Sequence, residues 1–82
     1  MKTINETIEK IKKEFRFEMA QRDINRQFQW ENEEMHHWQR AKQFEKYADE
    51  NQEKMNKLVD MYSFITEINW MDARQEIEKG AE

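Results

Sequence analysis

Apolar residues recur through the first third of the chain at the three- and four-residue steps of an α-helix. They form two rows that are out of phase with each other: Ile4, Ile8, Ile11 and Phe15, then Ala20, Ile24 and Phe28. Because a single straight stripe would keep its phase, we expect the helix to bend or break between residues 23 and 32. Thr3 and Glu6 have the spacing of a capping box, so the first helix is predicted to cover about residues 3–47.

No strong helix breaker interrupts the chain, which has no proline and a single glycine, Gly80. The best internal turn signal is the segment ADENQ at residues 48–52, where apolar positions lapse and Asp49 with Gln52 forms a second capping box. A further helix then covers about residues 52–79. The pattern predicts one small all-α domain over residues 1–82, either a helical hairpin or a three-helix arrangement.

The segment from Leu58 to Met71 is apolar at nine of its fourteen positions, so only a narrow polar stripe remains on a helix. Covering it requires neighbours on two sides, which favours a homodimeric helical bundle; a bent first helix that covers both sides within a monomer is the alternative. The positions assigned to the core or the dimer interface are Leu58, Tyr62, Phe64, Ile65, Ile68 and Met71.

A strand is the competing interpretation of the same segment. Its aromatic and β-branched residues alternate at Tyr62, Phe64, Thr66, Ile68 and Trp70. Because one strand is not stable alone, it would have to pair with its copy in a second chain. The all-helical interpretation is preferred, since no other segment shows a strand pattern.

Composition narrows the functional classes. Charged residues make up 39% of the 82 positions, the net charge is −4, and there is no cysteine. Disulfide frameworks and thiolate metal sites are therefore excluded, and the cytoplasm is the expected location. No apolar run is long enough to cross a bilayer, and the N-terminal segment lacks the apolar region of a signal peptide, so no membrane role is predicted.

Two overlapping Glu-x-x-His pairs stand in the segment ENEEMHHWQR. On a continuous helix, Glu34 and His37 would share the arc of Trp30, Trp38 and Phe44, facing inward. A dimer could then hold metal in the ferritin-like manner.

The second half of such a ferritin-like site is missing, because the nearest second-arm carboxylates, Asp60 and Glu67, lie on the polar stripe and the inward-facing Asp72 lies roughly 10 Å further along the axis. We therefore prefer a polar contact at a helix interface. No cofactor is predicted.

Nucleic-acid binding is a second alternative. Residues 10–26 contain six basic and three acidic residues with two phenylalanines among them. The candidates for phosphate contacts are Lys12, Lys13 and Arg16. The interspersed acids are more typical of the solvated face of an amphipathic helix, so this alternative is less favoured.

The sequence shows no catalytic constellation, since the Glu and His pair has no adjacent nucleophile and phosphate loops need glycines that are missing. We therefore predict a small non-enzymatic binding or regulatory protein that works through protein–protein contacts. Its size and charge density are similar to those of the accessory and inhibitor proteins of phages and mobile elements, an analogy only. The exposed aromatics expected to contact a partner are Phe17, Tyr47 and Trp70.

Overall fold

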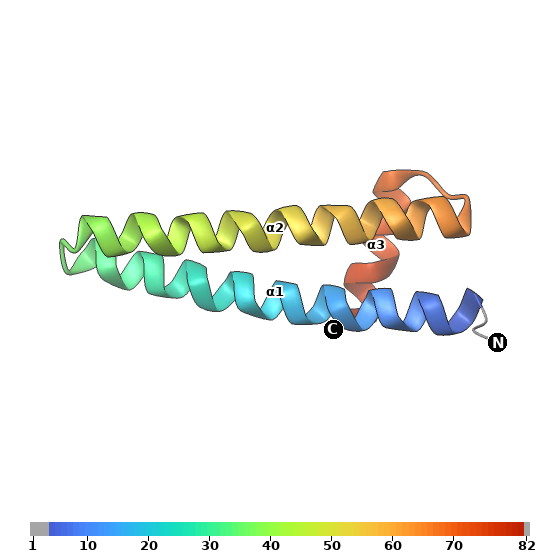
Figure 1. Ribbon diagram of the computed structural model, residues 1–82, viewed down its shortest axis with the longest axis horizontal. Helices are drawn as coiled ribbons and strands as arrows, with labels where there is room; N and C mark the ends of the chain where they lie inside the picture. The colour runs from blue at the N-terminus through green and yellow to red at the C-terminus, as the bar shows by residue number, and fades with distance from the viewer. Residues whose placement is uncertain (1–3, 82) are drawn as a thin grey trace.

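The protein is a three-helix structure in which the first two helices form a long antiparallel hairpin (Figure 1). The computed structural model describes residues 4–81, so the predicted cap at Thr3 lies outside the described residues. The helices are α1 (Ile4–Glu34), α2 (Trp38–Thr66) and α3 (Trp70–Ala81). The prediction of an all-α fold is confirmed, and within residues 4–81 no strand is present, so the strand interpretation is wrong.

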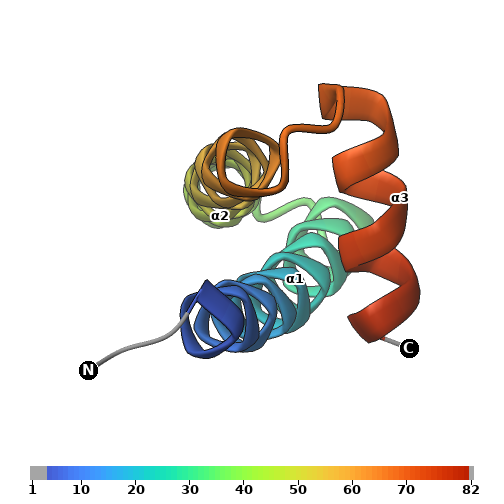
Figure 2. The same cartoon turned by 90° about the vertical axis from the view of Figure 1, so that its right-hand side faces the viewer.

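The short helix α3 packs across one face of the hairpin, at the end that holds the N-terminus (Figure 2). The apolar core lies where the three helices meet. It is lined by α1, α2 and α3 side chains that are almost fully buried: Ile11, Phe15, Met55, Leu58, Val59, Tyr62, Ala73 and Ile77. The opposite end of the hairpin extends beyond α3, so the molecule measures 50 × 24 × 19 Å and only part of its length has three-helix packing.

The first turn lies at residues 35–37, so the predicted helix over residues 3–47 and turn over residues 48–52 are wrong. His36 has φ 60° and ends α1 in the left-handed conformation. The His37 N–H donates to the Asn32 carbonyl at 2.7 Å, and the His36 N–H donates to the Glu33 carbonyl at 3.0 Å. These two bonds define a Schellman motif, which usually has glycine where this chain has histidine.

The segment predicted to be a turn lies inside α2, because its polar residues bond to α1 instead of capping a helix. Asp49 accepts from the Arg26 guanidinium at 2.9 Å, and Gln52 accepts from Arg22 at 2.8 Å. Ala48 in the same segment is fully buried. A small residue here allows the two helices to approach closely, so the lapse in large apolar residues marks a close helix contact.

A second turn at residues 67–69 divides the predicted helix over residues 52–79 into α2 and α3. Glu67 adopts φ 58° at the end of α2. Asn69 caps α3, since its side-chain oxygen accepts from the Asp72 N–H at 2.9 Å. The chain therefore reverses without glycine or proline, which is why the sequence pattern did not indicate this turn.

The apolar segment from Leu58 to Met71 is covered in part within one chain, by α1 and by α3. Leu58 and Tyr62 are buried, and Ile65 and Ile68 are half-buried against the core. Phe64 and Met71, which were assigned to the core or a dimer interface, are 86% and 62% exposed. Part of the apolar surface of this segment is therefore covered by α1 and α3, whereas Phe64 and Met71 are not in the core, and the predicted dimer stays a prediction.

Tyr62 links α2 to α3 through its hydroxyl, which donates to Glu76 Oε2 at 2.8 Å. Burial, followed by this hydrogen bond, raises the pKa of Tyr62 from 10.0 to about 12. The folded state therefore favours the neutral phenol more strongly than the unfolded state does. The contribution of Tyr62 to the free energy of unfolding that results from this pKa difference is fully present below pH 10 and is lost as the pH rises through the interval from 10 to 12.

We therefore expect Tyr62→Phe to flatten the fall in stability at alkaline pH. Urea unfolding of both proteins just below pH 10 and again between pH 10 and 12 measures this difference. At the lower pH, the variant should lose about 1 kcal/mol, the value of one net hydrogen bond. Equal losses of stability in the two proteins across the interval would show that Tyr62 does not titrate as described.

Candidate protein-docking surface

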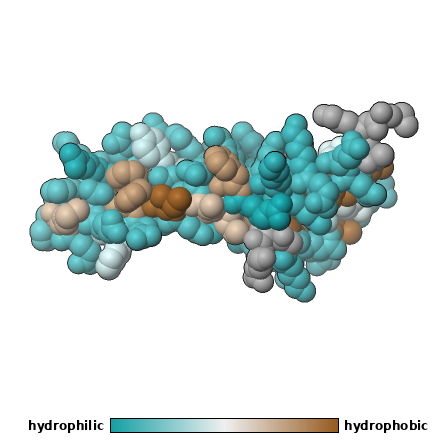
Figure 3. Space-filling model, turned by 90° about the horizontal axis from the view of Figure 1, so that it is seen from below, coloured by the Kyte–Doolittle hydropathy of each residue, from teal (hydrophilic) through white to brown (hydrophobic). Residues whose placement is uncertain are grey.

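Four large apolar side chains lie in one row, three of them on α1 and the fourth, Met35, in the turn directly after it, and Phe28 is partly covered by Phe44 of α2. The four are Phe17, Ile24, Phe28 and Met35, with exposed fractions of 61%, 47%, 43% and 56%. Figure 3 looks onto the outer side of the hairpin, below α1, and shows apolar side chains gathered along it. We call these four residues the outer stripe. Ala20, also exposed, lies beside them.

The outer stripe explains the phase shift between the two apolar rows of the sequence. At 100° per residue, Ile24 lies roughly 140° around the helix from Ile11. Ile11 is buried in the core, Ile24 is exposed, and α1 is unbroken through residues 23–32. The predicted bend is therefore wrong, because one unbroken helix carries two apolar rows on two different faces. The second row could have been found in the sequence from the steps of seven, four and seven residues between Phe17 and Met35.

Charge is distributed unevenly along the outer stripe. Lys13 and Arg16 flank its N-terminal end, and both are exposed. Glu31 and Glu34 flank its C-terminal end on the same side of the helix, at the 100° spacing of an α-helix. The stripe is therefore an apolar surface with one basic and one acidic end, a pattern that can orient a partner helix.

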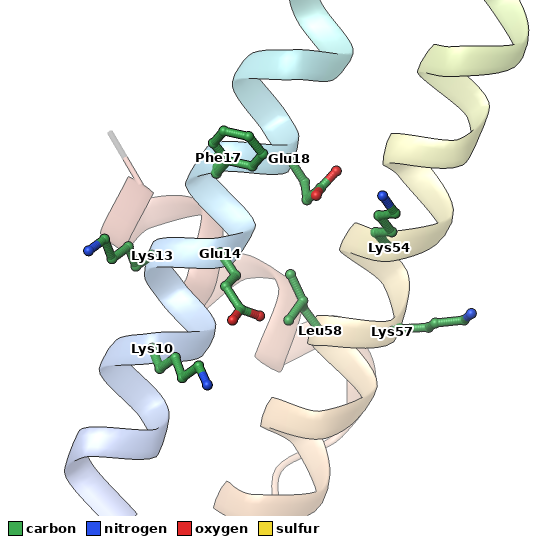
Figure 4. A pocket seen from close by; sticks show the side chains of 8 residues that line it. All are labelled: Lys10, Lys13, Glu14, Phe17, Glu18, Lys54, Lys57 and Leu58. Carbon is green, nitrogen blue, oxygen red and sulfur yellow. The ribbon is translucent and has the colours of Figure 1, made fainter.

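An open groove of about 570 Å³ adjoins the N-terminal end of the outer stripe, on the face opposite α3 (Figure 4). Leu58 lies at its centre, and Glu14 and Glu18 point into the space between α1 and α2. Its lining combines four lysines with two acids and two apolar residues: Lys10, Lys13, Lys54, Lys57, Glu14, Glu18, Phe17 and Leu58. The mixture of charges makes this groove a poorer site for a single ligand than the adjoining stripe is for a helix.

Beyond α3 the hairpin is held together largely by polar side chains. The Asn25 amide donates to Asn51 at 2.8 Å, and Asn51 in turn donates to Glu18 at 2.8 Å. Phe28 and Phe44 supply an aromatic contact, with ring centroids 5.2 Å apart. Two helices joined in this way leave much of their surface uncovered, because α3 does not reach this end (Figure 1).

The three aromatics predicted to contact a partner lie in different environments. Phe17 belongs to the outer stripe, and Tyr47, 39% exposed, packs edge-on against Phe44 at 6.1 Å. Trp70 is half-buried against the core, with the Arg74 guanidinium 5.9 Å from its ring. Of the three, Phe17 is the most available to a partner, and the structure adds Ile24, Phe28 and Met35 beside it.

Glu34 and His37 do not face inward, so the predicted buried pair is wrong. Both are exposed at the turn, because α1 ends at Glu34 and His37 precedes α2. Across residues 4–81, no three histidine, cysteine or acidic side chains come close enough together to hold a metal ion. The His36 ring instead lies 5.6 Å from the Trp38 ring.

This arrangement predicts that purified protein carries no stoichiometric iron or zinc. Two adjacent exposed histidines offer too few fixed ligands for a site that keeps its metal through purification. Elemental analysis of the unmodified chain and of His37→Ala measures this. A metal present in one-to-one ratio in the first protein and lost from the second would contradict the expectation.

Of the predicted phosphate contacts, Lys13 and Arg16 are exposed, whereas Lys12 is half-buried. The groove near Lys13 also contains Glu14 and Glu18, which repel phosphate. We expect no binding to a generic single-stranded oligonucleotide at about 0.15 M salt, as measured by fluorescence anisotropy. Binding that weakens steeply with added salt, and that Arg16→Glu removes, would favour the nucleic-acid alternative instead.

No protein-family model, curated protein or solved structure matches the chain. Within residues 4–81, none of the helices combines the length and the apolar character needed to cross a bilayer. The class of protein is therefore defined by its fold and surface: three helices, with an uncovered apolar face on the longest of them.

Proposed function

We propose that this protein is a small non-enzymatic binding protein that acts through protein–protein contacts on the outer stripe and works as a homodimer. The observation that carries the proposal is the row of Phe17, Ile24, Phe28 and Met35, all exposed along one face of α1 and the turn directly after it. Contiguous exposed apolar rows of this kind are typical of interaction sites, whereas single exposed apolar residues are ordinary. A regulatory or inhibitory role fits a protein whose main surface feature is a docking face.

The mode of binding that this surface favours is helix against helix. Residues spaced by seven and four positions meet a neighbouring helix along one seam, as in helical bundles. Two of the four side chains are phenylalanines, which bury large apolar areas, and the charged residues lie at the flanks and ends. The groove beside Phe17 extends the contact toward α2.

Site-specific photo-crosslinking in the cells that encode the protein tests this function. A benzophenone amino acid replaces Phe17 or Phe28 in the stripe and, as the matched control, Phe64. Phe64 is a phenylalanine that is even more exposed but lies on α2, off the stripe. We expect protein adducts from the stripe positions and none from Phe64. Adducts from Phe64 alone, or from none of the positions, would contradict the proposal.

A further inference from the structure

We infer that the occupant of the outer stripe is the α1 helix of a second copy, packed antiparallel, with the twofold axis beside Ile24. This inference rests on the proposed function, because it assigns an occupant to the same surface. Three observations support it. They are the sizes of the α1 side chains around Ile24, the distribution of charge along the outer stripe, and the two-helix packing of the hairpin at the end that α3 does not reach.

The side chains around Ile24 are complementary in size under a twofold axis. Ala20 lies four residues before Ile24 and Phe28 four residues after it. An antiparallel pair centred on Ile24 therefore brings Ala20 level with the partner's Phe28, and Phe28 level with the partner's Ala20. Each large ring then lies beside a methyl group, and the two Ile24 side chains meet at the axis. Alternation of large and small residues is how packed helix layers interdigitate.

Charge at the two ends of the stripe selects the antiparallel direction. Arg16 lies eight residues before Ile24 and Glu31 seven after it, so the pair centred on Ile24 places Arg16 level with the partner's Glu31. Lys13 likewise lies level with the partner's Glu34. A parallel pair would instead place the two basic ends together and the two acidic ends together. Asp23, which lies near the axis, is already paired with Arg22 at 3.1 Å.

The second copy also supplies packing where the hairpin lacks it. The helix α3 covers only one end of the hairpin (Figure 1), and neither Ile24 nor Phe28 belongs to the core cluster at that end. Beyond α3 the contact between α1 and α2 includes buried alanines such as Ala48, the bond from Asn25 to Asn51, and the ring pair of Phe28 and Phe44. A helix from a second copy, placed along the stripe, converts this two-helix end into a bundle with a larger apolar interior.

Single cysteines test the position of the axis, because the native chain contains none. Ile24→Cys places two thiols at the axis, so oxidation should yield a covalent dimer. The control Phe64→Cys, on an exposed residue off the stripe, should remain monomeric under the same conditions. Circular dichroism of each variant verifies that helicity is retained. A covalent dimer from Phe64→Cys but not from Ile24→Cys would overturn the inference.

Two further cysteine positions test the direction. In the antiparallel pair, two Ala20→Cys thiols are separated by eight residues of axial rise, about 12 Å, too far for a disulfide. Neither Ala20→Cys nor Phe28→Cys alone should then crosslink, whereas a mixture of the two proteins should give a heterodimer. Efficient crosslinking of Ala20→Cys with itself would indicate a parallel pair and overturn the inference.

Charge reversal tests the register of the antiparallel pair independently of the disulfides. Arg16→Glu should weaken self-association about 3- to 10-fold, because it places like charges together twice in the dimer. Adding Glu31→Arg to the same chain should restore the original dissociation constant, measured by sedimentation. Failure of the second change to restore association would overturn the register. A monomeric protein that still crosslinks to a different protein from Phe17 and Phe28 would overturn this inference and the homodimer, while it would support the outer stripe as a protein-docking surface; loss of both would overturn both proposals.

Discussion

Phe15→Ala is expected to lower the free energy of unfolding by about 3–5 kcal/mol. Phe15 is one of the largest fully buried side chains, and it lies where α1, α2 and α3 meet. Its removal leaves a cavity that the surrounding side chains fill only in part. A domain of this size has a total stability of about 4–12 kcal/mol, so the variant should lose at least about a quarter of it.

The matched control for this prediction is Phe64→Ala, which removes the same ring from a highly exposed position. It should change the free energy of unfolding by less than about 0.5 kcal/mol. Urea unfolding followed by circular dichroism, at one protein concentration, measures both variants. Similar losses in the two variants would mean that Phe64 belongs to the core, as its sequence context suggested, and that the packing described here is wrong.

Ile77→Ala is expected to cost about 2–5 kcal/mol and to loosen α3 from the hairpin. Ile77 is fully buried in the core cluster, whereas Met71 on the same helix is exposed. Met71→Ala is therefore the control, with an expected loss of less than about 0.5 kcal/mol. Undocking of α3 uncovers core residues such as Val59, so the Ile77 variant should also bind a hydrophobic dye.

The readout for α3 is the combination of unfolding and dye binding. A two-state loss of stability without dye binding would mean that α3 unfolds together with the hairpin. Retention of full stability in Ile77→Ala would contradict the assignment of α3 to the core. Deletion of the helix is a poorer test, because it removes the Tyr62 to Glu76 hydrogen bond at the same time.

The all-helical fold could be predicted from the sequence because the supporting signals are local. Helix-forming residues, the near absence of glycine and proline, and apolar residues at helical spacing all act within a few positions of one another. Leu58 and Tyr62 were correctly placed in the interior on this basis. A three-helix arrangement was an open alternative, but its break was expected between residues 23 and 32 and not at residues 67–69; the N-terminal cap of α3 at Asn69 is visible in the sequence only once the turn is known.

The turns could not be located from the sequence because both use unusual residues. His36 and Glu67 adopt the left-handed conformation that glycine or asparagine adopts at most helix ends. Conversely, Asp49 and Gln52 resemble a helix cap, but they bond to Arg26 and Arg22 across the hairpin. These contacts join residues more than twenty positions apart, which no local pattern indicates.

The candidate site was predictable only in part, for a related reason. Phe17 was correctly expected to be exposed, whereas the displaced row that contains Ile24 was interpreted as the sign of a bend. The sequence shows that two apolar rows exist but not which of them the rest of the chain covers. Which row is covered depends on where α2 returns along α1, and the turn between them was misplaced. The same error turned Glu34 and His37 inward, where the structure exposes them.

Sedimentation equilibrium of the unmodified chain at micromolar concentration tests most directly whether the outer stripe docks a second copy. The account predicts a mass twice the 10.3 kDa of one chain. It also predicts a single-chain mass for Ile24→Glu with helicity retained, because a charge then lies at the axis. Single molecules of 10.3 kDa for the unmodified chain, or a dimer that Ile24→Glu leaves intact, would contradict it.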